Sequence, residues 1–393
     1  MGELKRSLDF NDLMAVGVAS IMGSGGFNLI GDGIITGGPY FPIALGAVST
    51  LFQGLSRVYQ GAYEKFKTNT SESDLIKEQF GDAAEKISSF AIIMFNILSV
   101  STILVISAKL MFPAGSWSGQ VGFAIALLSS MTVFSLKGID FNKSIINIFS
   151  YGIVALLALA SMIGMIEFGQ KSEPLKFPEA VHGLKFDFPK SILYFFFIFA
   201  GFDTLMKFSE ESVNPDKDIP RSFYASNALS TLLTVGICFA FLVVFSKEKF
   251  SDNENIIARI AESMMGRQAG TAVASISIVL MVVTSFISFL ATTRYMYSLG
   301  REHVALEAFT YLNDNKVPWV SVIFTTVIAA AAILNNHVFT LVKLSDFTLT
   351  VTLLLVSLAA MRAQIKGGNA PIVEGATTFS LIALLCFCCN PFF

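Results

Sequence analysis

The sequence predicts an all-α, polytopic membrane protein with about eleven transmembrane helices, of which the first and the sixth are discontinuous. Hydrophobic residues make up 53% of the 393 residues and charged residues only 14%, and the mean hydropathy is +0.65. A soluble domain carries about 25% charged residues. Long apolar runs recur along the whole chain, and glycines interrupt two of them.

Each apolar run is long enough to cross a bilayer, since a membrane-spanning helix needs about 20 mainly apolar residues. The runs lie at 12–33, 39–62, 87–112, 119–136, 146–168, 190–210, 222–246, 270–298, 319–339, 341–361 and 371–389. Between them, the charged segment 63–86 is helix-like. The amphipathic segment 256–265 predicts a helix on the membrane surface.

The first apolar run contains Gly23-Ser24-Gly25-Gly26 at its centre. Each glycine weakens a helix by about 1 kcal/mol relative to alanine. Unwound backbone at membrane depth survives only where it is buried in protein or lines a cavity, so the break indicates a binding site. The free amides from Ser24 to Phe27 begin the next half-helix, and they suit an anionic group such as a carboxylate.

The sixth run is interrupted at Ala200-Gly201 and carries Asp203 just beyond. The carbonyls at the end of the first half-helix, from Phe197 to Ala200, suit an ammonium group. A carboxylate near the bilayer centre costs about 2.5–3.5 kcal/mol, which makes Asp203 a functional candidate. The alternative is that Asp203 only caps or pairs a neighbouring helix. Phe197 and Phe199 are candidates to close over a substrate.

The two interrupted runs lie five spans apart, as an inverted five-plus-five repeat requires. The first repeat would cover 12–168 and the second 190–361, with an additional helix at 371–389, all within one domain, 1–393. Glycine at a tight helix crossing is the competing explanation for both breaks. A carboxylate site at one break and an ammonium site at the other together describe an α-amino acid.

Four segments, in consistent order, resemble the amino acid–polyamine–organocation (APC) transporters. They are LKRSLDFNDLMAVGVASIMGSGGF at 4–27, Gly37-Gly38-Pro39, FFFIFAGFDTLMKFSEESVNPDKDIPRSF at 195–223, and RYMYSLGREHVALEAF with the following VPWV within 294–320. The resemblance implies a secondary transporter, a permease or an antiporter, that has the LeuT-like five-plus-five fold and works by alternating access.

The resemblance also assigns substrate-binding positions. It implies carboxylate contacts at the first break, an aromatic gate and amine-binding carbonyls at the second, an acidic position after the glycine, and a contact on the eighth helix. The candidates are Ile21, Gly23, Ser24, Gly25, Gly26, Phe197, Ala200, Gly201, Asp203 and Ser288.

The coupling ion stays open between H⁺ and Na⁺. Many members of this family carry a lysine in the fifth helix, whereas 147–153 contains none. Hydroxyls of the eighth run are candidates for sodium ligands, although such hydroxyls more often bond their own backbone. These hydroxyls belong to Ser285, Ser288, Thr292 and Thr293. The family usually has twelve spans, and its last two helices often make the dimer contacts. Because we count about eleven spans here, we expect a monomer or a weak dimer.

With the predicted spans, most of the 27 Lys and Arg residues fall in segments on the same side of the membrane as the N-terminus. The positive-inside rule therefore predicts a cytoplasmic N-terminus, in a multi-pass protein of the cell (plasma) membrane.

The sequence favours a transporter over other classes of protein. No basic tract predicts nucleic-acid binding, and no residue set predicts an enzyme, a cofactor or a metal site. The leading hypothesis is amino acid transport with a slight preference for cationic substrates, because the sixth run is acidic and rich in phenylalanine. A polyamine transporter of the same fold and a non-transporting amino acid sensor or scaffold are the alternatives.

Overall fold

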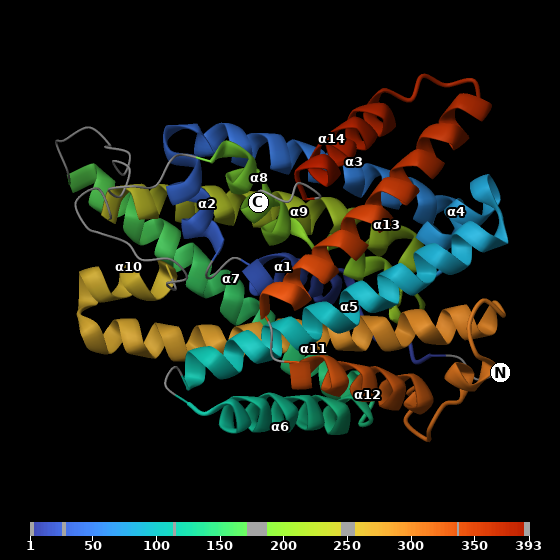
Figure 1. The fold of residues 1–393 in the computed structure, drawn as a ribbon, viewed down its shortest axis with the longest axis horizontal. Coiled ribbons are helices and arrows are strands. Elements are labelled where there is room, and N and C mark those ends of the chain that lie inside the picture. Colours follow the sequence, from blue (N-terminus) through green and yellow to red (C-terminus); the bar gives the residue numbers. More distant parts are fainter. Residues whose placement is uncertain are drawn as a thin grey trace.

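The structure is a computed structural model, and it describes residues 4–25, 29–112, 115–170, 187–244, 256–335 and 338–388. Nearly all of the described chain is helical (Figure 1). In chain order, the elements are α1 (Phe10–Gly25), α2 (Leu29–Gly37), η1 (Gly38–Tyr40), α3 (Phe41–Phe66), α4 (Ser71–Phe80), α5 (Asp82–Met111), α6 (Trp117–Ser135), α7 (Ile139–Gln170), α8 (Phe188–Phe199), η2 (Phe202–Glu211), α9 (Pro215–Val244), α10 (Ile256–Met265), α11 (Arg267–Arg301), η3 (Glu307–Thr310), α12 (Trp319–Asn335), α13 (Val338–Lys366) and α14 (Ile372–Cys388).

Among the described residues, eight helical stretches are long and apolar enough to cross a membrane. One of them, Leu29–Phe66, joins α2, η1 and α3. Three shorter apolar helices accompany them, at Phe10–Gly23, Trp319–Leu334 and Ile372–Leu385. The all-helical membrane class is therefore confirmed, while the number of eleven spans stays a prediction.

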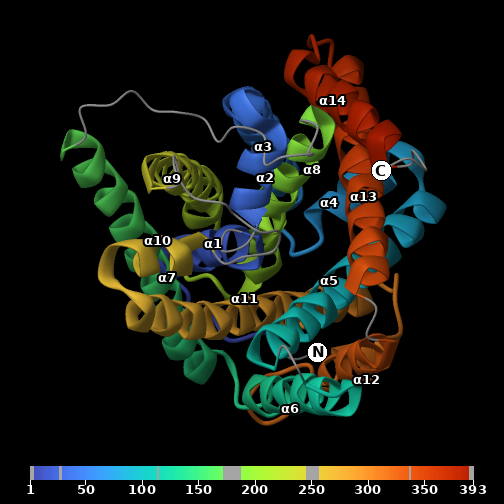
Figure 2. The same cartoon turned by 60° about the vertical axis from the view of Figure 1, so that its left-hand side comes forward.

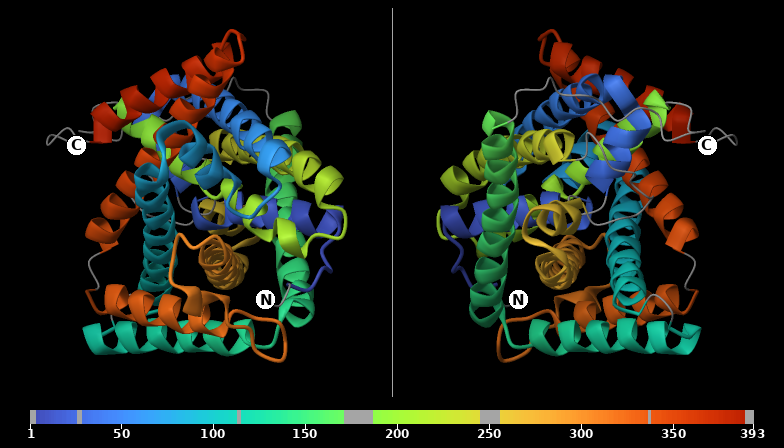
Figure 3. Two further views of the ribbon diagram at one scale, coloured as in Figure 1. Left: turned by 90° about the vertical axis from the view of Figure 1, so that its right-hand side faces the viewer. Right: turned by 90° about the vertical axis from the view of Figure 1, so that its left-hand side faces the viewer.

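Helix α11 runs through the middle of the molecule. Figure 3 shows it nearly end-on, with α5 on one side, α7 on the other and the α6–α12 pair beneath. Helix α11 contacts each of these four helices. Helix α1 crosses α11 in the interior (Figure 2). The outer helices therefore surround α1 and α11.

The second predicted interruption lies at a helix end, while the first, predicted at 23–26, falls partly within α1 and partly on residues outside the description. Helix α1 ends at Gly25 and α2 begins at Leu29, with 26–28 outside the described residues. Helix α8 ends at Phe199; Ala200 is extended, and Gly201 has φ 101° before η2 begins. The halves pack crosswise, because α2 lies against α8 while α1 lies against η2.

Helices α7 and α9 approach unusually closely. A Cβ atom on Gly164 would lie 2.3 Å from the Cα of Ala240, and one on Gly236 would lie 2.4 Å from the Oγ of Ser161. Small residues on both helices thus allow backbone-to-backbone packing, as is common between membrane helices.

The two segments between spans form helices α4 and α10. Helix α4 packs against α3, α5 and α13 at one end of the molecule. Helix α10 packs against α11, with Ile257 and Ile260 buried in the protein core. The apolar face of α10, which we expected on the membrane surface, is therefore covered by protein.

Candidate functional site

The second interruption lies directly on α1. A Cβ atom at Gly201 would be 2.7 Å from the backbone oxygen of Ser20, and the φ of 101° at Gly201 is one that side-chain-bearing residues rarely adopt. Both conditions require glycine. The break of one span is thereby held against the helix that leads into the other break.

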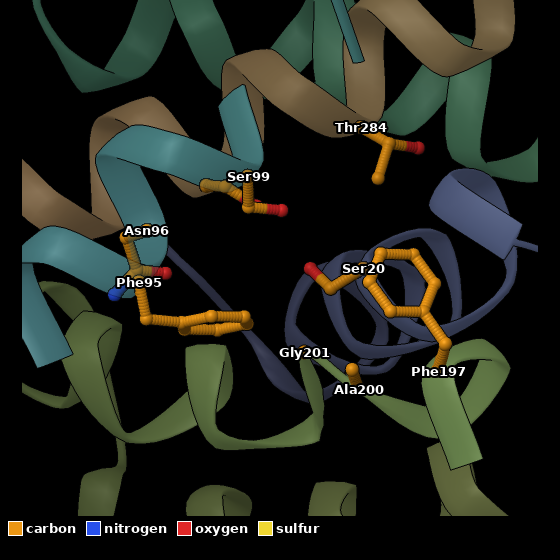
Figure 4. Close-up of a pocket in the computed structure, with 9 residues that line it drawn as sticks. Ser20, Phe95, Asn96, Ser99, Phe197, Ala200, Gly201 and Thr284 are labelled. Atoms are coloured by element: carbon orange, nitrogen blue, oxygen red, sulfur yellow. The ribbon is translucent and has the colours of Figure 1, made fainter. Parts of the chain in front are cut away.

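A small cavity lies beside this contact (Figure 4). Its volume is about 10 Å³, which is room for about one water molecule. The residues that line it are Ser20, Phe95, Asn96, Ser99, Phe197, Ala200, Gly201, Thr284 and Ser288. They come from α1, α5, α11 and the junction of α8 with η2, and the described lining contains no charged side chain.

The lining has two faces. In Figure 4, the Ser20 hydroxyl and the Phe197 ring lie on one side of the cavity, and the side chains of Phe95, Asn96 and Ser99 lie on the other. The Ser20 hydroxyl is buried and has no hydrogen-bond partner among the described residues. A buried, unpaired hydroxyl costs free energy, so a ligand that bonds to it would remove that cost.

Helix α11 fixes the last turns of α1 beside the cavity. The Thr284 hydroxyl lies 3.1 Å from the backbone oxygens of Ala19 and Leu280, and it donates to them. Gly23 lies so close to Thr284 that a Cβ there would be 1.6 Å from the Thr284 Oγ1. The glycine allows the close approach of α1 and α11.

The structure brings four predicted site residues to the cavity, and they are Phe197, Ala200, Gly201 and Ser288. The others lie elsewhere. Ile21 is fully buried in the core, Gly23 packs on Thr284, and Ser24 and Gly25 form the end of α1. Gly26 lies outside the described residues. Phe199, also considered, stacks on Phe52 with ring centroids 5.6 Å apart.

The suggested sodium ligands of the eighth run mostly bond within their own helix. Ser285 donates to the oxygen of Val282 at 2.8 Å, and Thr292 donates to that of Ser288 at 2.7 Å. Thr293 donates to its own helix as well. This is the usual arrangement of hydroxyls in membrane helices.

Asp203 does not line the cavity but forms a buried ion pair with Lys207, four residues later. The partner lies within η2 itself and not on a neighbouring helix, and a role of Asp203 in substrate binding stays a prediction. The Lys207 ammonium also lies 5.7 Å from the centre of the Tyr295 ring. The i, i+4 spacing of Asp203 and Lys207 on a helix is a signal in the sequence that could have indicated this pair.

Five cavity residues were not predicted, and they are Ser20, Phe95, Asn96, Ser99 and Thr284. Asn96 offered a signal, since a polar amide within an apolar span is a candidate site residue. Ser20 offered one too, because it precedes the glycine break by one helical turn.

Ion pairs close the end of the molecule at which η2 and α11 finish. Arg294 and Glu211 form a buried pair with an N–O distance of 3.2 Å, and Arg301 bonds Glu210 at 2.9 Å. The Asn69 side chain, between α3 and α4, joins them by accepting from the Glu210 backbone amide at 3.0 Å. Charged and polar groups thus connect three segments across this end.

An acidic cluster lies at the same end. One carboxylate oxygen from each of Asp74, Glu85 and Glu302 lies within 4.8 Å of the other two. Burial and, to a smaller extent, the nearby Asp74 carboxylate raise the pKa of Glu302 to about 7. Glu302 therefore titrates close to neutral pH.

The match to known proteins covers nearly the whole chain. The model of a family described as amino acid permease matches residues 8–393. The chain belongs to the amino acid permease family. The APC resemblance of its sequence is thereby confirmed.

Relatives of this permease include a branched-chain amino acid permease, BcaP of Bacillus subtilis, 23% identical over 94% of the chain and 83% of that protein. The low-affinity putrescine importer PlaP of Escherichia coli is 23% identical over 84% of the chain and 75% of that protein. Both relatives are transporters by name, and the permease is an integral membrane protein.

A solved structure with a similar fold is that of MhsT in complex with L-phenylalanine. Its TM-score is 0.64 at 12% identity, and the alignment covers 98% of the permease and 99% of MhsT. At this identity the likeness concerns the fold, and it confirms the expected LeuT-like class.

Proposed function

We propose that this permease moves neutral α-amino acids across the membrane by alternating access, and that the substrate binds where the two discontinuous spans meet. The observation that carries the proposal is the contact of Gly201 with the Ser20 backbone beside a lined cavity. Family membership supports amino acid transport in general.

The ends of the broken helices suit the two charged groups of an amino acid. Helix α8 ends at Phe199, and the negative end of its dipole lies at Phe197 and Ala200, beside the cavity, where it favours an ammonium group. The Phe197 oxygen already accepts from the Ala200 amide at 3.2 Å, but a carbonyl has a second lone pair. The Ser20 hydroxyl is the nearby donor for a carboxylate.

The lining favours a neutral side chain over a cationic one. Part of the expected cationic preference came from the acidic sixth span, and the charge of its Asp203 is balanced by Lys207. The described lining offers instead the two rings of Phe95 and Phe197 with small hydroxyls and an amide. Burying an unpaired cation there would be costly, whereas apolar contact with aromatic rings is favourable.

The small size of the cavity supports alternating access. An amino acid is larger than a single water, so its binding requires the walls to separate. We propose that the pair Arg294–Glu211 acts as a gate at one end, because it joins α11 to the end of η2. Breaking the pair would let η2 move away from α11.

Uptake into proteoliposomes tests this function. The purified permease is reconstituted, and accumulation of labelled leucine, phenylalanine, lysine and putrescine is measured beside protein-free vesicles. We expect neutral amino acids to be taken up and to compete with one another. Uptake of putrescine alone would instead support the polyamine alternative. Saturable leucine binding without flux would support the sensor alternative.

A further inference from the structure

We propose that Glu72 is a proton-binding site that couples substrate movement to a proton gradient. This inference rests on the proposed transport function and names its coupling ion. It starts from a carboxyl group that the substrate site does not use.

Glu72 lies in the first turn of α4 and is completely buried. Neither of its carboxyl oxygens has a hydrogen-bond partner on another described residue, and only its own backbone amide acts on the carboxyl as a donor. A buried carboxylate without a partner is strongly disfavoured, and such a group usually takes up a proton instead. Its first-turn position alone does not make it a site, but its complete burial without a partner shows that the structure tolerates a neutral acid there.

The Glu72 segment is connected to the second break through Tyr295. The Tyr295 hydroxyl forms a hydrogen bond with Ser73, the residue that follows Glu72. The Lys207 ammonium lies over the Tyr295 ring at 5.7 Å and donates to Asp203. A contiguous set of buried groups therefore runs from α4 through α11 to η2.

The buried charges do not balance unless a proton is present. Glu72, Asp203 and Lys207 bring two carboxylates and one ammonium into the interior. The pKa of Glu72 is raised to about 8, mainly by burial; the Lys207 ammonium and the backbone amide of Glu72 lower it, and the Asp203 and Asp74 carboxylates raise it. With the Glu72 proton in place, Lys207 and Asp203 form a neutral pair.

The other ionisable groups around α4 have partners of their own. Glu85 of α5 accepts from Lys77 at 3.0 Å, and Asp74 accepts from the Thr68 hydroxyl at 2.6 Å. From α13, Arg362 lies 5.3 Å from the ring of Phe80, at the far end of α4. From α3, the Tyr59 hydroxyl lies within reach of the charges of both Glu72 and Asp203. Lys207 is the cation whose charge acts on Glu72.

When Glu72 loses its proton, its carboxylate competes with Asp203 for the Lys207 ammonium. The ammonium then has two carboxylates to balance, so its bond to Asp203 competes with its attraction to Glu72. Asp203 follows Gly201 by two residues, so a weakened pair loosens η2 at the point where it touches α1. A proton that binds Glu72 from one side and leaves to the other would then drive the substrate with it.

The test uses the full-length permease in proteoliposomes, with labelled leucine and an interior about two pH units more alkaline than the exterior. We expect the gradient to increase net uptake by the wild type. Glu72→Gln, which mimics the protonated acid, should abolish this increase while still catalysing counterflow exchange of leucine. Glu78→Gln is the matched control, because Glu78 is on the same helix but exposed and paired with Lys65.

The outcomes separate the two proposals. A wild type that exchanges leucine but gains nothing from the pH gradient would overturn the role of Glu72 and leave the transport function standing. The same holds if Glu72→Gln keeps the full increase. A wild type that neither accumulates nor exchanges any amino acid would overturn both proposals. Proton uptake that accompanies leucine entry, followed with a pH-sensitive dye, should vanish in Glu72→Gln and persist in Glu78→Gln.

Discussion

Lys207 donates to Asp203 one helical turn earlier, and both side chains are buried. The pair therefore lies just past the break at Gly201, where a lone carboxylate would attract a cationic substrate. Because the charge of Asp203 is balanced within the protein, Asp203 offers no uncompensated charge to a cationic substrate. The pair also makes η2 sensitive to any change in nearby charge.

Removing only one partner of this pair should be more harmful than removing both. Lys207→Met leaves an unpaired buried carboxylate, and Asp203→Asn leaves an unpaired buried ammonium. Each should destabilise the protein by about 3–5 kcal/mol, while the double substitution should recover most of that loss. Thermal unfolding in detergent measures the effect. Single and double variants of equal stability would show that the pair is not coupled.

Gly201→Ala should impair both folding and uptake. The positive φ costs a side-chain-bearing residue about 1–2 kcal/mol, and the added Cβ would meet the Ser20 oxygen at 2.7 Å. Gly46→Ala is the control, since a Cβ there meets nothing within 4 Å on helix α3, and it should keep wild-type uptake. Comparable uptake by the two variants would contradict the close contact between the break and α1.

Ser20→Ala should separate binding from stability. Its hydroxyl lacks a partner in the described structure, so its loss should leave the melting temperature unchanged or slightly raised. The same change should raise the apparent KM for leucine about tenfold if the hydroxyl contributes a bond of about 1.4 kcal/mol to the bound carboxylate. Ser107→Ala removes an equally buried and unpaired hydroxyl away from the cavity. An equal KM in both variants would exclude Ser20 from the site.

The melting temperature should fall as the pH rises toward 8. The pKa of Glu72 is raised from an ordinary 4.5 to about 8, and that of Glu302 to about 7. Between 4.5 and these values the folded protein holds protons that the unfolded chain releases, so stability declines with pH and levels off above about 8. In differential scanning fluorimetry, Glu72→Gln should flatten the decline over the upper part of this range. A slope equal to that of the wild type would mean that Glu72 does not titrate there.

Weakening the gate should expose the cavity from one end. Glu211→Gln removes the charge that balances Arg294, so η2 should separate from α11 more often. A cysteine introduced at Ser99, which lines the cavity, should then react faster with a water-soluble maleimide than the same cysteine in the otherwise wild-type chain. Glu78→Gln supplies the matched background, and no difference between the backgrounds would remove Glu211 from the gate.

Local signals in the sequence were sufficient for the second break. Gly201, with its φ of 101°, cannot continue an ordinary helix, whereas Gly23 and Gly25 still belong to α1 and Gly23 packs on Thr284 of α11. The end of α8 at Phe199 and the positive φ at Gly201 agree with the expected second break. The cavity positions Phe197 and Ala200 followed from the same break.

The opposite wall of the cavity and the buried charges could not be derived in this way. Phe95 and Asn96 reach the cavity only because α5 packs against α11, a contact between segments far apart in the sequence. Lys207 and Arg294 are buried, and Asp203 and Glu211 neutralise their charges. Contacts and ion pairs between distant segments leave no regular spacing of residues in a single sequence, so they cannot be read from it.

The close packing of α7 on α9 has a practical consequence. Since the two backbones are in close contact at Gly164 and Gly236, these helices cannot slide or rotate against each other without a clash. We expect the distance between them to serve as a constant reference for spectroscopy. Distances from a spin label on α7 to one on α9 should stay constant through the cycle, and labels on η2 can be referred to that unchanging baseline.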